Sequence, residues 1–408
     1  MAAWPVADRE FRINRARAAL QSRHGEEALA WLSPLIASHP KSGEFHFQLA
    51  RAYRRIGRLG QVEPCLLRAR ELDYPVAALQ REQILALAQA GRMTDAEPAL
   101  RGLLLNPGED GADICEAFAS GYFLNFQIIP GLKILEAWEK DYPGDAQPHV
   151  FRGKYYENLS SWQLASAEYR RALELSPEST ATRVRLAQVL VELNEYAAAH
   201  KEFDRCLGQS PDDVEALVGR ARCLRVAGRD DAARRDLLHS LKLDPGSAEA
   251  LGVLGELELQ AGDSSAAIQR LRESIARDST SIEFRNALAG ALQSAGQTQA
   301  AQEQFKYVDA ARSAELKIHA AMRLLLKHDD DLNSDEELRI RFEIGSLTLR
   351  YGDPADGVAW LESVLRLDHD YAPAHQLLFE HFSSLGDDAL AERHRIQALR
   401  PEGKPHGS

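Results

Sequence analysis

The chain has 408 residues, 45% of them hydrophobic and 27% charged, a length that suits two or three average domains or one extended repeat array. Its 61 acidic residues outnumber its 49 basic ones and give a formal charge of −12, which argues against a nucleic-acid-binding or membrane-docking surface. The four cysteines lack the spacing of a metal or redox site, which favours a reducing compartment. No apolar run is long enough to span a membrane, and residues 8–10 are charged where a signal peptide would be apolar. Together these features predict a cytoplasmic protein.

Prolines and glycines repeat with one period. The prolines are 34 residues apart, at Pro143, Pro177, Pro211 and Pro245, and each closes a run with helical spacing of apolar residues. The glycines follow the same period, at Gly57 and Gly91 and then at Gly228, Gly262 and Gly296. Self-similarity of this kind indicates copies of one 34-residue unit.

Each unit is predicted to hold two helices. When the unit is numbered so that the glycine falls at place 15, apolar residues at places 4, 7, 8 and 11 share one side of a first helix, as Leu217 and Leu224 do. Small and aromatic residues at places 20, 24 and 27 form the face of a second helix, as Ala199 and Phe203 do. Proline at place 32 ends the second helix because it cannot donate a backbone hydrogen bond.

These units resemble the tetratricopeptide repeat, whose pattern has small, aromatic, glycine and proline residues at the same places. The best copy spans 146–179, with matches at Gly153, Tyr156, Ala165, Tyr169, Ala172 and Pro177. Eleven copies begin at residues 9, 43, 77, 112, 146, 180, 214, 248, 282, 338 and 372, and Arg23 and Phe126 replace the turn glycine in the first and fourth. The resemblance implies an all-α, right-handed superhelical solenoid of stacked antiparallel helix-turn-helix repeats.

The register divides the chain into five segments. We expect a lead-in over 1–8, nine repeats over 9–311, an irregular helical insertion with an acidic linker over 312–337, two repeats over 338–400 and a disordered tail over 401–408. Residues 298–328 contain neither Gly nor Pro, which predicts one long helix or two nearly continuous ones. Ser334 and Glu337 have the spacing of a capping box at the start of the next helix.

The acidic linker is the densest candidate for a metal site. Its alternate oxygen ligands, Asp329, Asp331, Asn333 and Asp335, have the spacing of a calcium loop. Such a loop also needs Gly at its sixth position and Glu at its twelfth, where this chain has Ser334 and Ile340. A solvated linker with a helix cap is therefore favoured over a metal site.

No catalytic motif stands out, so we expect a protein that is not an enzyme and carries no cofactor or metal. Cys115 and Cys206 fall on inward-facing places, where free cysteine fills space as a small apolar residue. The sequence 368–370, Asp-His-Asp, falls in an interhelix turn, and its side chains are expected to point into water.

The free side of each first helix is the candidate binding surface. Places 2, 5, 9, 12 and 13 lie opposite the packed stripe and line up from repeat to repeat, and the family resemblance implies that they form a concave groove for peptides. The candidate groove residues are Arg51, Arg54, Arg55, Lys154, Asn158, Gln188, Arg222 and Arg225. Their charge predicts an acidic partner segment. The alternative is that they only pair with nearby acids such as Glu157 and Glu192.

Chaperone-binding members of the family hold a terminal carboxylate with Lys, Asn and Arg at fixed places. Units five to seven carry Val150, Lys154, Arg185, Glu215 and Gly219 at those places, so this clamp is not expected. The sequence predicts a non-catalytic scaffold or adaptor that binds a protein or peptide in the groove. The alternative is a substrate-recognising subunit of an enzyme complex whose catalytic chain is separate. The sequence does not indicate an oligomeric state.

Overall fold

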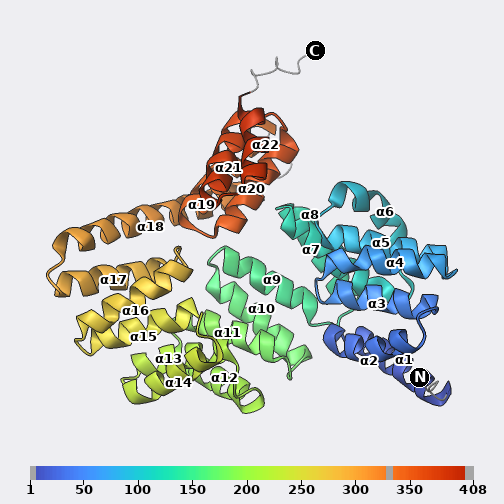
Figure 1. Cartoon of the computed structure of the whole chain (residues 1–408), viewed down its shortest axis with the longest axis horizontal. Coiled ribbons are helices and arrows are strands. Elements are labelled where there is room, and N and C mark those ends of the chain that lie inside the picture. The colour runs from blue at the N-terminus through green and yellow to red at the C-terminus, as the bar shows by residue number, and fades with distance from the viewer. Residues whose placement is uncertain (1–5, 328–333, 400–408) are drawn as a thin grey trace. The chain divides into compact units, whose positions relative to one another are not determined.

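The chain folds into antiparallel helical hairpins, as the 34-residue period predicts. A computed structural model describes residues 6–327 and 334–399, and these ranges contain α-helices and two short 3-10 helices but no strand (Figure 1). The prediction of an all-α repeat solenoid is therefore confirmed. Among the helices in these ranges, none combines the length and the apolar character that crossing a bilayer requires.

The contacts divide the chain into two compact units, Met1–Pro143 and Gly144–Ser408, a division inside the expected run of nine repeats. The first unit contains α1 (Val6–Gln21), α2 (Gly25–Ser38), α3 (Gly43–Arg55), η1 (Leu59–Gln61), α4 (Val62–Glu71), α5 (Val76–Gln89), α6 (Met93–Leu105), η2 (Gly108–Asp110), α7 (Gly111–Leu124) and α8 (Ile128–Asp141). The hairpins pair consecutive helices within this unit.

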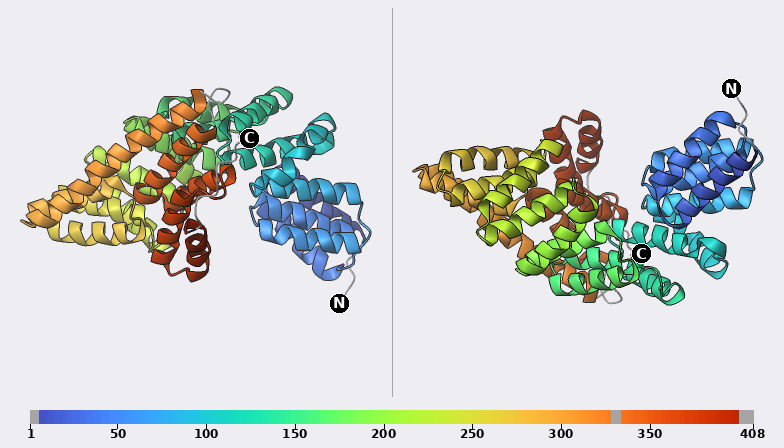
Figure 2. Two further views of the ribbon diagram at one scale, coloured as in Figure 1. Left: turned by 90° about the horizontal axis from the view of Figure 1, so that it is seen from above. Right: turned by 90° about the horizontal axis from the view of Figure 1, so that it is seen from below.

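The second unit continues the same pattern. It contains α9 (Gln147–Asn158), α10 (Trp162–Leu175), α11 (Thr180–Glu192), α12 (Tyr196–Gln209), α13 (Val214–Val226), α14 (Asp230–Leu243), α15 (Ala248–Gln260), α16 (Ser264–Arg277), α17 (Ile282–Ser294), α18 (Thr298–Lys327), α19 (Ser334–Tyr351), α20 (Pro354–Leu367), α21 (Ala372–Leu385) and α22 (Asp388–Ala398). Further views show α18 as one continuous rod (Figure 2).

The turns inside the hairpins keep one geometry even where the glycine is missing. Gly228 and Gly262 adopt the left-handed conformation, with φ of 67° and 85°. Arg23 and Phe126 adopt it as well, with φ of 63° and 56°. The turn is thus preserved in the first and fourth repeats, at the conformational cost that a side chain incurs at positive φ.

The first helices of several repeats begin at a side-chain cap. The Asp213 carboxylate accepts a hydrogen bond from the backbone N–H of Ala216 at 2.9 Å, and Ser247 accepts one from Ala250 at 3.2 Å. Each cap satisfies one of the unpaired N–H groups at a helix start. The caps therefore fix where the helix of each new repeat begins.

The core consists of small and aromatic residues that meet between helices. Ala199, Phe203 and Cys206 of α12 are fully buried, and Phe203 packs so closely on Gly219 of α13 that no Cβ would fit there. Cys115 is buried too, which confirms the prediction that both cysteines fill core positions. Close approach at small residues is what stacks successive hairpins.

The long helix α18 confirms the first of the two alternatives for residues 298–328. It runs without interruption for 30 residues, so residues 312–327 are regular helix rather than an irregular insertion. Because α18 runs antiparallel to α17 and is longer, its C-terminal half extends past the first residue of α17 toward the α9–α10 turn, where the Ser160 hydroxyl lies 3.4 Å from His319 Nε2. The fifth repeat and the extended second helix of the ninth repeat are thus in contact.

The acidic linker lies mostly outside the described residues, which omit 328–333. The predicted capping box and the calcium-loop alternative both involve it, together with the side chain of Ser334. Helix α19 begins at Ser334, and Glu337 accepts a hydrogen bond from Arg341 Nε at 2.8 Å. The expected tail at 401–408 also falls outside the described ranges.

Candidate functional site

The candidate groove residues of the second unit lie on α9, α11 and α13. Lys154 and Asn158 of α9 are exposed, and Gln188 of α11 is half-buried. The Gln188 amide donates to Glu215 of α13 at 3.4 Å. We call the surface formed by the free sides of α9, α11, α13, α15 and α17 the inner face.

Arg222 of α13 ties three repeats together across the inner face. Its Nη1 donates to both carboxylate oxygens of Glu283 on α17, at 3.0 and 2.8 Å, and its Nε lies 3.2 Å from Glu249 on α15. The guanidinium also lies over the ring of Phe284, 5.6 Å from its centre. Only 17% of the side chain is exposed, so Arg222 is a partly buried brace and not a free surface cation.

Arg225, one turn further along α13, is paired as well. Its Nη2 lies 2.9 Å from Glu256 on α15, whose side chain is 13% exposed. Burial raises the pKa of Glu256, and the neighbouring Glu283 carboxylate raises it further, while Arg225 and Arg222 act in the opposite direction. Arg222 therefore interacts with both Glu256 and Glu283.

A cavity of about 220 Å³ opens on the inner face beside Arg222. Its lining includes Glu192, Glu215, Glu249, Glu283 and Arg222, with the ring of Phe203 and the backbone at Gly219. With Glu256 included, five glutamates surround two arginines, so negative charge is in excess here. This surplus is the main electrostatic feature of the inner face.

The surplus affects the protonation of Glu192. Burial raises the pKa of Glu192, Arg222 lowers it, and Glu283, Glu315 and Glu249 each raise it. Glu315 belongs to α18, so the long helix adds a further carboxylate near the cavity. Nearby like charges disfavour ionisation, and an added cation would relieve them.

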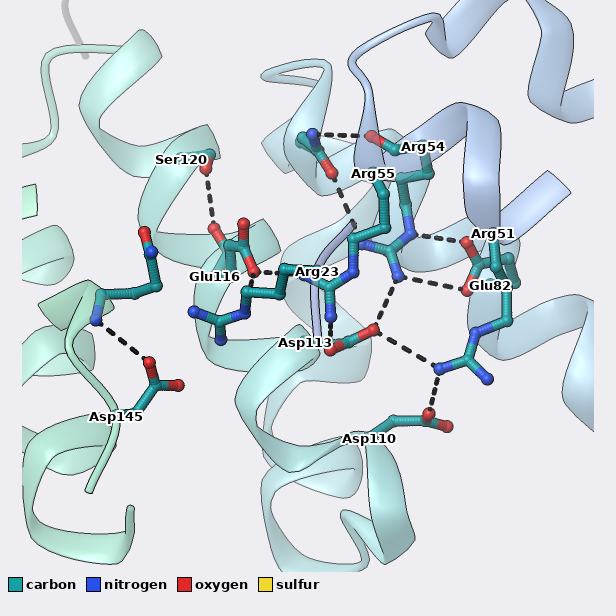
Figure 3. A network of polar contacts seen from close by, with 12 residues as sticks. Arg23, Arg51, Arg54, Arg55, Glu82, Asp110, Asp113, Glu116, Ser120 and Asp145 are labelled. Carbon is teal, nitrogen blue, oxygen red and sulfur yellow. Dashed lines mark hydrogen bonds and ion pairs between the residues drawn. The ribbon is translucent and has the colours of Figure 1, made fainter. Parts of the chain in front are cut away.

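The three candidate arginines of the first unit form a largely buried ion-pair network with acids of α5, η2 and α7 (Figure 3). Arg54 is 1% exposed and donates from Nε to Glu82 at 2.5 Å and from Nη2 to Asp113 at 3.1 Å. Arg55 pairs with Asp113 and Glu116. Burial by itself would raise the pKa of Asp113, but the three arginines together outweigh it, and the pKa is lowered.

Arg51 completes the same network. Its Nη2 donates to Asp110 at 2.9 Å and lies 3.5 Å from Asp113 (Figure 3). Arg23, from the turn after α1, approaches Glu116 at 3.4 Å. The expectation of a solvent-facing row is thus corrected for Arg54 and Arg55, whose side chains are turned into the packed layer between helices because their carboxylate partners lie there.

The acids that pair with the arginines differ from those expected. In the second unit, Glu157 lies near Arg185 at 3.8 Å, while Arg222 and Arg225 take Glu249, Glu283 and Glu256. The sequence contained a signal for this. Glutamates occupy place 2 of three consecutive repeats, at Glu215, Glu249 and Glu283.

The remaining candidates from the sequence are the histidines, acids and cysteines outside the inner face. Within residues 6–327 and 334–399, no three His, Cys, Asp or Glu side chains are grouped as metal ligands. Burial raises the pKa of Cys206 and of Cys223 to about 11, which disfavours the reactive thiolate. The side chains of His369 and Asp370 are 71% and 63% exposed, which confirms that this turn points into water.

Stacked helical hairpins with a polar inner face define an all-α repeat solenoid, an architecture of protein–protein interaction scaffolds. Residues 13–61, 184–248 and 231–282 match the model of the tetratricopeptide repeat family. No curated protein sequence matches the chain.

Several solved structures are similar to the chain. PilW, a type IV pilus biogenesis factor, is 21% identical with a TM-score of 0.42, over 47% of this chain and 90% of PilW. A thermophilic tetratricopeptide repeat protein of Thermus thermophilus is 18% identical with a TM-score of 0.37, over 49% and 98%. The human IFIT1 dimer with PPP-AAAA is 16% identical with a TM-score of 0.42, over 88% and 90%. At these identities and scores, none of the three bears on what this chain binds.

Proposed function

We propose that the chain is a non-catalytic scaffold or adaptor that holds a protein segment on the inner face of α11, α13, α15 and α17, and that this segment carries Lys or Arg residues. The observation that supports it is the surplus of five glutamates over two arginines around the cavity at Arg222. Four cysteines without a disulfide suit the reducing cytoplasm as the place of action.

The charge of the segment follows from which groups are already paired. Arg222 and Arg225 are held by Glu249, Glu283 and Glu256, so an acidic segment would have to displace these intramolecular carboxylates. A Lys or Arg side chain would instead form charge-assisted hydrogen bonds with carboxylate oxygens that face the cavity. A basic segment therefore replaces the acidic one as the favoured partner of the inner face.

The size of the cavity limits what enters it. At about 220 Å³ it is smaller than the pockets that enclose drug-sized molecules, and it has room for a single long side chain. The neighbouring places of the inner face, including exposed Lys154 and Asn158 of α9, are left to contact the rest of the segment. An extended peptide with one anchoring basic residue fits this geometry.

Replacing two glutamates of the cavity by glutamine, a neutral residue of the same shape, tests the proposal with little effect on folding. Glu192 and Glu215 are not among the carboxylates that brace Arg222 and Arg225, so the double variant Glu192→Gln, Glu215→Gln removes two charges from the cavity and keeps the braces. The matched control is Glu174→Gln, Glu178→Gln, whose side chains are exposed on α10 and in the turn that follows it. The probes are fluorescein-labelled decapeptides of alternating Lys and Ser and of alternating Glu and Ser.

We expect the Lys-Ser peptide to bind wild type with an affinity that falls as salt rises, and the inner-face variant to bind it about tenfold more weakly. The control should stay within about twofold of wild type. Tighter binding of the Glu-Ser peptide, or equal binding of the Lys-Ser peptide by both variants, would contradict the proposal.

A further inference from the structure

A larger cavity, of about 630 Å³, lies within the second unit between α18, α19 and α21. Its volume is in the range of pockets that enclose small molecules or several side chains of a peptide. Apolar side chains line part of it, including Ala314 of α18, Leu349 of α19 and Leu377 of α21. Small residues such as Ala314 leave the space open.

Two cations, Lys317 of α18 and Arg350 of α19, stand at this cavity. Neither Lys317 of α18 nor Arg350 of α19 forms a hydrogen bond or ion pair within the part of the chain that the structure describes, and both are exposed. The Arg350 guanidinium lies 5.4 Å from the ring centre of Tyr351, a contact that leaves its N–H groups available. Arg54 and Arg222 differ, because carboxylates hold their guanidinium groups. On a protein with a formal charge of −12, two such cations beside a cavity are free to accept an anion.

The other polar groups of the cavity leave this positive charge largely uncompensated. Among the described residues that line it, Glu380 of α21 is the one acid, and its carboxylate accepts a hydrogen bond from Gln376 at 2.6 Å. Burial lowers the pKa of His381, so this ring is neutral near pH 7 and contributes a hydrogen-bonding group without charge. The Ser313 hydroxyl adds a further donor, whereas the Ser346 hydroxyl donates to the backbone oxygen of Glu343 at 3.0 Å.

We infer that this cavity binds an acidic protein segment in which an apolar side chain stands beside Asp or Glu. The apolar side chain would pack against Leu349 and Leu377, while the carboxylate would pair with Lys317 and Arg350. Complementarity of charge and of apolar surface together selects this occupant over a basic or a purely polar segment. The inference is independent of the inner face, because the two sites share no residue.

The experiment uses the full chain and three fluorescein-labelled decapeptides, of alternating Leu and Glu, Ser and Glu, and Leu and Lys. The test variant is Lys317→Gln, Arg350→Gln. The control variant Lys201→Gln, Arg235→Gln removes the same charge from positions on α12 and α14. A third variant, Ser313→Trp, fills the cavity without changing the charge, and circular dichroism checks that all variants keep their helix content.

We expect the Leu-Glu peptide to bind wild type more tightly than either other peptide. Lys317→Gln, Arg350→Gln and Ser313→Trp should each weaken its binding about tenfold, and the control should not. Glu192→Gln, Glu215→Gln should leave it unchanged, which separates this site from the inner face. Equal binding of the Leu-Glu and Ser-Glu peptides, or unchanged binding by Lys317→Gln, Arg350→Gln, would overturn the inference.

Discussion

Arg222 and Glu283, two repeats apart, are joined by an ion pair that crosses the inner face from α13 to α17, in which Nη1 of Arg222 donates to both carboxylate oxygens. Arg222 occupies place 9 of its repeat and Glu283 place 2 of the second repeat that follows. Arg51 and Asp113 occupy the same two places in the first unit and lie 3.5 Å apart. The same repeat register thus produces the same cross-brace in both units.

These ion pairs link the first helices of repeats that are not adjacent. The apolar contacts between helices join neighbouring repeats. In a repeat array most contacts join nearest neighbours, and stability is close to a sum of neighbour terms. An ion pair that skips one repeat couples three hairpins and opposes changes in the curvature of the array. The inner face is therefore held in shape before any partner arrives.

Replacing Arg54 by Met should strongly destabilise the first unit. The substitution leaves Glu82 and Asp113 buried without the guanidinium that pairs with both, and breaking a buried ion pair from one side costs about 3–5 kcal/mol. Urea unfolding followed by circular dichroism measures the change. Arg68→Met, at an exposed position paired with Glu71, should cost less than about 0.5 kcal/mol. Similar losses for the two variants would show that the network contributes no more than a surface pair.

Two glycine substitutions test the packing of the second unit. A Cβ on Gly219 would lie 2.1 Å from the ring of Phe203, so Gly219→Ala should destabilise the unit by about 1–3 kcal/mol. Gly290→Ala on α17 meets its nearest neighbour, Leu259, at 3.8 Å, and should instead stabilise it by about 0.5–1 kcal/mol. Midpoints of thermal unfolding measure both, and a shift in the same direction would show that the register of α12 on α13 is wrong.

The sequence predicts the hairpins because their determinants are local. A period of 34 residues, a glycine at the turn and the places of small and aromatic residues are all visible along the chain, and Phe203 on Gly219 follows from them. The turns at Arg23 and Phe126 keep the same geometry without glycine, because packing on either side compensates for the strain. The hairpin fold is therefore set by patterns within one repeat.

The partners of the inner-face charges are determined by longer-range geometry. Helical spacing shows that Arg222 and Arg225 face the inner side, but which acids reach them depends on the rotation from one repeat to the next. The contact of His319 with Ser160 depends on that rotation accumulated over several repeats. The cavity at Lys317 and Arg350 lies where α18 extends past α17, its partner in the hairpin. The pattern of a single repeat does not predict such a cavity.

The α21–α22 hairpin should loosen as the pH falls below about 6.5. His375 Nε2 donates to the backbone oxygen of His369 at 2.9 Å, so its Nδ1 accepts from His394 Nδ1, also at 2.9 Å. Burial lowers the pKa of His394, and His375 and Arg393 lower it further. At a pH below the pKa of His394 in the unfolded chain, about 6.5, the unfolded state binds more protons than the folded state. The contribution of neutral His394 to folding stability is therefore complete above about pH 6.5 and is lost as the pH falls.

Hydrogen exchange of the α22 amides at pH 7.5 and 5.5, corrected for the intrinsic pH dependence of exchange, measures this effect. His394→Gln keeps a side-chain donor toward His375 but does not titrate, so its protection should depend less on pH than that of wild type. An identical pH dependence in both proteins would rule out His394 as the titrating group.

Glu256 should make the second unit less stable as the pH rises. Burial and the neighbouring Glu283 raise the pKa of Glu256 above its unfolded value, so the folded state binds more protons, and its advantage is lost as the pH rises through the folded pKa. Glu256→Gln should therefore flatten the fall in the urea midpoint between pH 5.5 and pH 8. Glu174→Gln, at an exposed position, is the control and should keep the slope of wild type.

The variant Arg222→Gln tests whether the segment that binds the inner face is acidic or basic. If an acidic segment binds through the groove arginines, Arg222→Gln removes a ligand and weakens binding of the Glu-Ser peptide. If a basic segment binds through the surplus glutamates, the same change frees Glu249 and Glu283 from their internal cation and strengthens binding of the Lys-Ser peptide.

We expect the second outcome, with a gain of at least about threefold at low salt that shrinks at moderate salt, because the gain is electrostatic. Arg222→Gln also loses a brace, so the circular dichroism spectrum and the urea midpoint of the variant are measured alongside. Glu283→Gln is the comparison variant, because it removes the carboxylate from the same ion pair. It should weaken binding of the Lys-Ser peptide. Weaker binding by both variants would mean that the brace itself, through the shape of the inner face, controls binding.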